Sequence, residues 1–313
     1  MGVMIDGQYH VDDPAPDSRL DGTFQRAKST IRHWISADTS TAFPAEVGRY
    51  HLFAAWNCPW AHRALLAIRF KGLEDAISVS YARPRRTPEG WVFDVEGDGD
   101  GGGEFADPLM GLSALHQAYS RDTTPYTGRI TVPLLWDKVA GCAVSNESAD
   151  IVRMLGDAFP GTNLTPKPLL PKIDAWNARI YTEVNNGVYR AGFARTQAAY
   201  DAAVYALFAT LDEIDAHLEN RKWLVGDTFT EADLRLFPTL ARFDVAYHYA
   251  FKCNIRRLCD YAHLWPYAKA IYAMPGVAET VRFEIYKQGY FSRSELRNPL
   301  GIVPAGPVID WTP

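Results

Sequence analysis

The hydrophobic pattern changes its period twice within the first third of the chain. Residues 50–55 form an apolar run that predicts a strand, and from Pro59 to Lys71 the apolar positions take helical spacing. Residues 76–81 return to a strand pattern, so the three segments predict a β-α-β unit. Proline suits the first helical position because it has no N–H to leave unpaired, and the helix is therefore predicted to begin at Pro59.

Two further strands are predicted over residues 129–137 and 142–144, and a helix opens at residues 145–148. Pro133 lacks the N–H that a sheet ladder needs, which predicts a cis bond between Val132 and Pro133 at the start of the strand. Such a turn leaves the backbone of Val132 available to an extended peptide ligand. Together with the β-α-β unit, this order of elements predicts a thioredoxin-like domain.

The stretch between these two groups, residues 82–128, has no regular pattern and is interpreted as an insertion. Its run Asp94–Gly103 is rich in glycine and aspartate, which predicts a solvated loop. Trp91 belongs to a local aromatic cluster, where it either pins the loop by packing or forms a platform over a bound ligand. Residues 1–47 predict an arm with one short helix near residues 23–35.

A proline-rich stretch, Pro160 to Pro171, predicts a domain boundary, and the pattern beyond it is helical. Helices are predicted over residues 173–184, 196–218, 230–243, 255–261 and 264–274, with a last short helix after Pro275-Gly276. Thr230 and Asp233 have the spacing of a capping box at one helix start. The predicted architecture is α/β followed by all-α: an arm (1–47), a thioredoxin-like domain (48–158) with an insertion at about 82–128, an all-helical domain (170–290) and a tail (291–313).

Composition and charge narrow the class of protein. A chain of 313 residues is longer than one core usually holds, which favours two domains. Its net charge of -5 gives no basic surface for nucleic acid or anionic lipid, and no long uncharged apolar run predicts a membrane span. The four cysteines fit neither a disulfide scaffold nor a zinc site, which favours reduced thiols in the cytoplasm and predicts no metal: Cys58, Cys142, Cys253 and Cys259.

Cys58 is the candidate nucleophile, because it is predicted to lie at the start of the helix that follows it. Helix N–H groups and the helix dipole favour a thiolate there, although a small buried residue at a turn is an equally simple interpretation. Ala61 occupies the position where a dithiol oxidoreductase has its second cysteine. Redox chemistry at Cys58 would therefore need an external thiol such as glutathione. Farther along, Glu147 and Ser148 open a helix, where they either bind a carboxylate or only cap the helix.

Several motifs follow one another in the order found in the glutathionyl-hydroquinone reductases, the Xi class of the glutathione transferases. They are CPWAHR at 58–63, GLEDAISV at 72–79, TVP at 131–133, NES at 146–148, VNNGVY at 184–189, RFD at 242–244 with FKCN at 251–254, and GIVP at 301–304. The chain resembles this family over about residues 20–307. It departs from the family pattern in the Asp94–Gly103 run, in Asn57 before the cysteine, and in Tyr290-Phe291 where the family has paired tyrosines.

The resemblance implies glutathione-dependent reduction of a glutathionyl-hydroquinone through a mixed disulfide on Cys58. It assigns proton donation to Tyr189, and stabilisation of the thiolate to Tyr247 and Tyr290. The residues it assigns to glutathione binding are Trp91, Arg129, Ile130, Thr131, Val132, Glu147 and Ser148. It also implies a homodimer.

Two other functions stay open at this point. The first is a transferase that cleaves thioethers or dehalogenates another aromatic conjugate, which the Tyr290-Phe291 change leaves room for. The second is a non-catalytic scaffold that binds partners through its helical half, although the joint presence of Cys58, Tyr189 and Glu147-Ser148 argues against it. His62 is interpreted as a residue that supports the site or packs the helix rather than as a base, and Cys253 is interpreted as a core residue.

Overall fold

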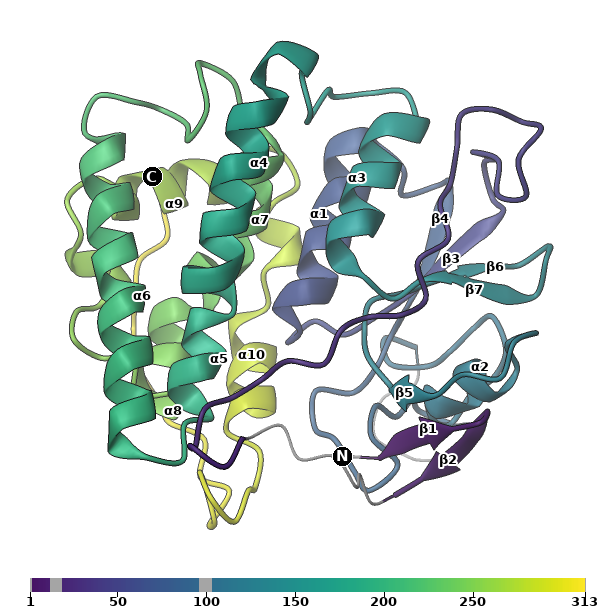
Figure 1. Cartoon of the computed structure of the whole chain (residues 1–313), viewed down its shortest axis with the longest axis horizontal. Coiled ribbons are helices and arrows are strands. Elements are labelled where there is room, and N and C mark those ends of the chain that lie inside the picture. Colours follow the sequence, from purple (N-terminus) through teal and green to yellow (C-terminus); the bar gives the residue numbers. More distant parts are fainter. Residues whose placement is uncertain (1, 12–18, 96–102, 313) are drawn as a thin grey trace. The chain divides into compact units, whose positions relative to one another are not determined.

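The computed structural model describes residues 2–11, 19–95 and 103–312 (Figure 1). The chain divides into two compact units: Met1–Ala15 with Ala27–Thr162, and Pro16–Arg26 with Asn163–Pro313. The change from one unit to the other after Thr162 falls inside the proline-rich stretch. Most of the predicted Asp94–Gly103 loop, residues 96–102, lies outside the described residues.

A four-stranded sheet forms the centre of the first unit. In sheet order its strands are β4 (Ile77–Tyr81), β3 (Tyr50–Ala54), β6 (Leu134–Asp137) and β7 (Cys142–Ser145). Strand β4 runs parallel to β3, whereas β6 and β7 are antiparallel to their neighbours. Helices α1 (Pro59–Lys71) and α3 (Ser148–Ala158) pack beside each other along the sheet (Figure 1). This arrangement confirms the predicted thioredoxin-like domain.

A second, smaller sheet lies in the same unit. Its order is β2 (Gln8–His10), β1 (Val3–Ile5) and β5 (Gly128–Arg129), all antiparallel. Strand β1 thereby joins the N-terminal residues to the end of the insertion, in which α2 (His116–Ser120) is a short helix.

The prediction of a short helix near residues 23–35 is wrong. The described chain is extended there, and His33 donates its backbone N–H to Val144 O at 2.8 Å, while Ile31 O accepts from Asn146 N at 3.1 Å. Strand β7 is the last strand of its sheet and presents N–H and C=O groups that need partners. Pairing with that edge outweighs the local helical spacing.

The second unit is helical, as predicted. Its helices are α4 (Leu170–Arg179), α5 (Gly187–Gly192), α6 (Gln197–Leu218), α7 (Glu231–Arg242), α8 (His248–Ala250), α9 (Leu264–Tyr272) and α10 (Phe283–Tyr290). Two π-helical turns continue α4 and α7: η2 (Ile180–Asn185) and η3 (Phe243–Tyr247). Short 3-10 turns are η1 (Lys167–Leu169), η4 (Leu258–Asp260) and η5 (Ala278–Thr280). In the part of the chain that the structure describes, no helix combines the length and apolar character needed to cross a membrane.

Two details of this unit test the helix predictions. The predicted helix over residues 255–261 is wrong, because only the turn η4 forms there. The Asp244 carboxylate accepts the backbone N–H groups of Leu258 and Cys259 at 2.6 and 3.1 Å, which fixes the chain in that turn. By contrast, the capping box of Thr230 and Asp233 at the start of α7 is confirmed.

Candidate active site

Cys58 is the N-cap residue of α1, at the end of the loop that follows β3. Its Sγ accepts the backbone N–H of Ala61 at 3.5 Å and donates to the backbone oxygen of Val132 at 3.4 Å. The residue is 8% exposed. The Ala61 N–H and the helix N-terminus favour a thiolate, whereas the Val132 oxygen favours a thiol, because only a thiol can donate. Both protonation states therefore have a hydrogen-bond partner at this position.

The loop before Cys58 is hydrogen-bonded to the insertion at two points, one near its start and one near its middle. The Asn57 side-chain N–H donates to Pro84 O at 3.1 Å, and the Trp56 indole N–H donates to the Glu104 carboxylate at 3.1 Å. The Trp56 ring also stacks on Tyr81, with ring centroids 4.0 Å apart. Asn57, which departs from the family pattern, thus anchors the loop that carries the cysteine to the insertion.

The backbone of residues 129–132 was predicted to bind glutathione, and the bond between Val132 and Pro133 is cis, as predicted. The Tyr119 hydroxyl donates to Thr131 O at 3.0 Å, and the Tyr126 hydroxyl donates to Arg129 O at 3.0 Å. Burial raises the pKa of both tyrosines, so they stay protonated donors at neutral pH. Ile130 and Val132 are both buried. Two phenols therefore hold the backbone of this segment in place.

Glu147 and Ser148 are adjacent residues at the start of α3. The Glu147 carboxylate caps the helix by accepting the Ala149 N–H at 3.1 Å, which is the capping alternative left open by the sequence. The Ser148 hydroxyl accepts from the Arg63 guanidinium at 3.4 Å. Arg63 belongs to α1 and is only 2% exposed. A helix N-terminus beside a buried cation is suited to binding a carboxylate.

Arg63 was not singled out from the sequence. The available signal was a charged residue within the otherwise apolar helix that begins at Pro59, since such a residue is rarely buried without a paired partner. The neighbouring His62 is buried within α1, as the packing interpretation expected.

Trp91 packs inside the insertion and is 4% exposed. The Arg86 guanidinium lies 4.1 Å from the centroid of the Trp91 ring. The backbone oxygen of Trp91 accepts the N–H of Leu115 at 2.8 Å. These contacts match the packing alternative. A role of Trp91 in ligand binding stays a prediction.

Three predicted tyrosines meet in the second unit. Tyr189 comes from α5, Tyr247 from η3 and Tyr290 from α10, and the Tyr290 hydroxyl lies 3.0 Å from each of the other two hydroxyls. Burial raises the pKa of Tyr247 and Tyr290 well above the usual value, so both stay protonated. Because a phenol has one proton, Tyr290 can donate to only one of its two neighbours at a time.

Aromatic rings surround this tyrosine cluster. Phe251 lies 5.3 Å from both Tyr189 and Tyr247 between ring centroids, and Phe24 lies 6.5 Å from Tyr189. Phe24 was not singled out from the sequence, because it lies in the N-terminal arm, far from the tyrosines along the chain. Cys253, predicted to be a core residue, is fully buried, and burial raises its pKa, which keeps it an inert thiol.

Comparison with known proteins agrees with this architecture. Residues 57–158 match the family described as "Glutathione S-transferase, N-terminal domain", and residues 197–270 match "Glutathione S-transferase, C-terminal domain". A thioredoxin-like unit followed by a helical unit is thus the architecture of a glutathione transferase.

Similarity to individual proteins shows to which class of glutathione transferase the chain belongs. The chain is 45% identical to the glutathionyl-hydroquinone reductase PcpF of Sphingobium chlorophenolicum, over 98% of this chain and 96% of that protein. The Xi-class transferase of Natrialba magadii has a similar structure, with a TM-score of 0.89 and 39% identity over 99% of this chain and 94% of that one. The glutathione-bound structure of YqjG from Escherichia coli K-12 gives a TM-score of 0.85 and 43% identity, covering 90% and 94% of the two chains. The chain belongs to the Xi-class glutathione transferases, the family of the glutathionyl-hydroquinone reductases.

Proposed function

We propose that this protein uses glutathione to reduce glutathionyl-hydroquinones to hydroquinones. The observation that carries the proposal is the placement of Cys58 at the N-cap of α1, with Ala61 where a second cysteine would stand. The 45% identity to PcpF, whose name gives this activity, supports the substrate class.

In the first step, the Cys58 thiolate attacks the sulfur of the conjugate. A sulfur–sulfur bond forms and the bond between sulfur and the aryl carbon breaks, with its electron pair staying on the carbon. Tyr189 donates a proton to that carbon. The products are a mixed disulfide between Cys58 and glutathione, and a free hydroquinone.

In the second step, a glutathione thiolate attacks the glutathionyl sulfur of the mixed disulfide. Glutathione disulfide leaves, the Cys58 thiolate is restored, and the proton lost by the incoming glutathione returns to Tyr189. The aryl carbon gains two electrons, which the two glutathione sulfurs lose. Ala61 matters because a neighbouring thiol would divert the mixed disulfide into an internal bond.

Glutathione would bind along the backbone of residues 129–132, with Trp91 beside it. Glu147 would take the γ-glutamyl ammonium and Ser148 its carboxylate, while Arg129 would pair with a further carboxylate. A ligand N–H that pairs with the Val132 oxygen would compete with the Cys58 thiol for that acceptor and weaken its bond. Ligand binding would then shift the balance at Cys58 toward the contact that favours its thiolate. The homodimer implied by the family resemblance is part of the same proposal.

The test is mass spectrometry of the intact, reduced protein after incubation with a glutathionyl-hydroquinone and no free glutathione. We expect one glutathione on Cys58 and an equal amount of released hydroquinone. Cys58→Ser should give neither, whereas the matched control Cys142→Ser, at a half-buried thiol, should behave like the wild type. An adduct that persists in Cys58→Ser would refute the mechanism.

Two other outcomes would decide between the alternatives. Absence of both adduct and hydroquinone in the wild-type protein would favour a binding scaffold. Faster release of glutathione from a different aromatic conjugate, such as a haloaromatic thioether, would favour the other transferase activity.

A further inference from the structure

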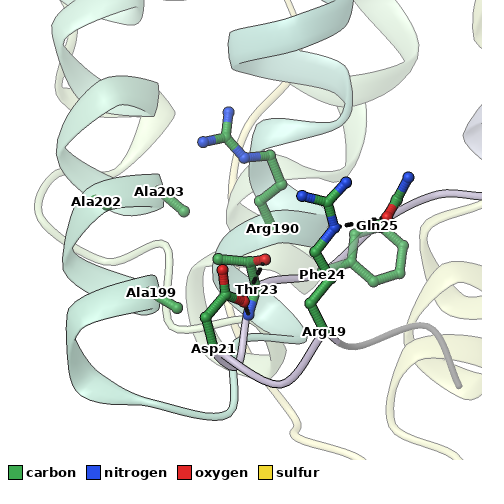
Figure 2. Close-up of a pocket in the computed structure, with 9 residues that line it drawn as sticks. All are labelled: Arg19, Asp21, Thr23, Phe24, Gln25, Arg190, Ala199, Ala202 and Ala203. Carbon is green, nitrogen blue, oxygen red and sulfur yellow. Dashed lines mark hydrogen bonds between the residues drawn. The ribbon is translucent and has the colours of Figure 1, made fainter.

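Residues 19–26 belong to the second unit, apart from the residues that follow them in the sequence. Gly22 has a φ of +83°, and a Cβ there would lie 2.7 Å from a methyl carbon of Thr196, so the close approach requires glycine. The backbone N–H of Arg195 donates to Gly22 O at 3.0 Å. Figure 2 shows this segment beside α5 and α6, where it lines a cavity of about 330 Å³. The segment is therefore fixed at the start of α6 and lies beside α5, the helix that carries Tyr189.

The last residue of this segment, Arg26, lies over Tyr189. Its guanidinium carbon is 4.5 Å from the centroid of the Tyr189 ring. Its Nε donates to the side-chain oxygen of Asn186 at 2.9 Å, and Asn186 is the N-cap residue of α5, three residues before Tyr189. The ring of Phe24 lies 5.4 Å from the same guanidinium carbon. The cation is thus tethered at the face of the phenol ring.

The other groups of the second unit that surround Tyr189 do not offset the charge of the Arg26 guanidinium. Titratable groups that face it include Tyr247 and Tyr290, which burial keeps neutral, and Arg242 of α7 adds a second positive charge close to those two phenols. Phe193 and Phe251 supply apolar rings on the remaining sides. Charge that develops on Tyr189 would therefore meet a cation in surroundings with little competing negative charge from these groups.

We propose that Arg26 stabilises the Tyr189 phenolate that forms when Tyr189 donates its proton to the aryl carbon. This inference rests on the proposed function and adds a positioning residue to it. A cation over a ring face attracts a phenolate, whose charge spreads into the ring, more strongly than it attracts a neutral phenol. Arg26 thereby makes Tyr189 a stronger acid, and the Tyr290 hydroxyl can donate to the phenolate until Tyr189 is reprotonated.

The first test does not depend on the reaction. The tyrosinate absorbance of Tyr189 is isolated as the difference between the protein and its Tyr189→Phe variant during an alkaline titration. In Arg26→Gln the Tyr189 midpoint should move up by about one pH unit, while Arg26→Lys should keep most of the wild-type value. Arg190→Gln is the matched control, since Arg190 is adjacent to Tyr189 in α5 but pairs with Glu183 at 3.5 Å. An unchanged midpoint in Arg26→Gln would overturn the inference.

The second test measures single-turnover hydroquinone release against pH. Arg26→Gln should lower the rate at neutral pH about tenfold and move the alkaline loss of activity to higher pH. In the Tyr189→Phe background the Arg26 substitution should have no further effect, and an equal loss there would contradict a role through Tyr189. If Arg26→Gln does not fold, Asn186→Ala, which removes only the tether, should shift the midpoint in the same direction.

These two tests separate the inference from the proposed function. If the wild-type protein forms no glutathione adduct on Cys58, the proposed function fails, while the titration still decides whether Arg26 acts on Tyr189. If the adduct forms but the midpoint does not move, the inference about Arg26 fails alone.

Discussion

Tyr290→Phe removes the hydroxyl that links the other two tyrosines while keeping the ring that packs against them. The Tyr290 hydroxyl lies 3.0 Å from those of Tyr189 and Tyr247, and its ring centroid lies 5.2 Å from that of Tyr247. The substitution therefore changes hydrogen bonding with little change in shape. It also leaves the hydroxyl of the fully buried Tyr247 with one partner fewer.

The two consequences are of similar size but appear in different measurements, the rate and the free energy of unfolding. A hydrogen bond to a charged group contributes about 1.5–3 kcal/mol, so loss of the bond to the Tyr189 phenolate should slow proton donation by roughly 10- to 150-fold. The weakened bonding of buried Tyr247 should lower the free energy of unfolding by about 1–3 kcal/mol. A merely structural hydroxyl would cause the second effect without the first.

Rapid-quench measurement of hydroquinone release in a single turnover gives the rate, and urea unfolding gives the stability. Tyr286→Phe is the matched control: it lies one turn earlier in α10, and its hydroxyl donates to Thr280 O at 3.4 Å. That variant should lose some stability and keep its rate. A Tyr290→Phe rate within twofold of the wild type would refute a role for this hydroxyl in proton donation.

Two further predictions concern stability. Burial lowers the pKa of His51 from 6.5 to about 4, so the folded state disfavours its protonation. The contribution of His51 to the free energy of unfolding should be complete above about pH 6.5 and fall by up to ~3 kcal/mol as the pH drops to about 4. Urea titrations of the wild type and His51→Gln should therefore give different slopes of the free energy of unfolding against pH. Equal slopes would contradict the prediction. Asp233→Ala removes an acceptor used by the backbone N–H groups of Leu224 and Thr230, the Thr230 hydroxyl and the Tyr267 hydroxyl. Urea unfolding of this variant should show that the free energy of unfolding is lower by roughly 3–5 kcal/mol. A decrease below about 1 kcal/mol would show that other groups replace the carboxylate.

Elements whose signals are local were predicted well from the sequence. Helix α1 begins at Pro59 and ends before Gly72, whose φ of +64° is the left-handed conformation that glycine adopts readily. The capping box of α7 is another local signal, because Thr230 and Asp233 are only three residues apart. Each of these features depends on neighbouring residues in one segment, so the order of residues is sufficient to predict it.

Elements that depend on a distant partner were predicted poorly. The arm near residues 23–35 has helical spacing but pairs with the edge of β7, more than one hundred residues away. Residues 255–261 likewise follow the Asp244 carboxylate rather than their own pattern. Neither partner can be inferred from the segment it directs, because the backbone of β7 and the Asp244 carboxylate come close to these segments only in the folded protein.

The same distinction applies within the tyrosine cluster, and it explains why Arg26 was missed. Tyr189 could be singled out because it lies in a motif whose order resembles that of a known family, whereas Arg26 is 160 residues away from Asn186, the residue that tethers it. Nothing in the arm predicts that a guanidinium from residue 26 will lie over a ring in α5. The residues that perform a reaction can thus follow from short motifs, while the charges that adjust their acidity depend on contacts between distant segments. Substitutions in residues 19–26 are therefore expected to change the pH dependence of the reaction even where every predicted site residue is intact.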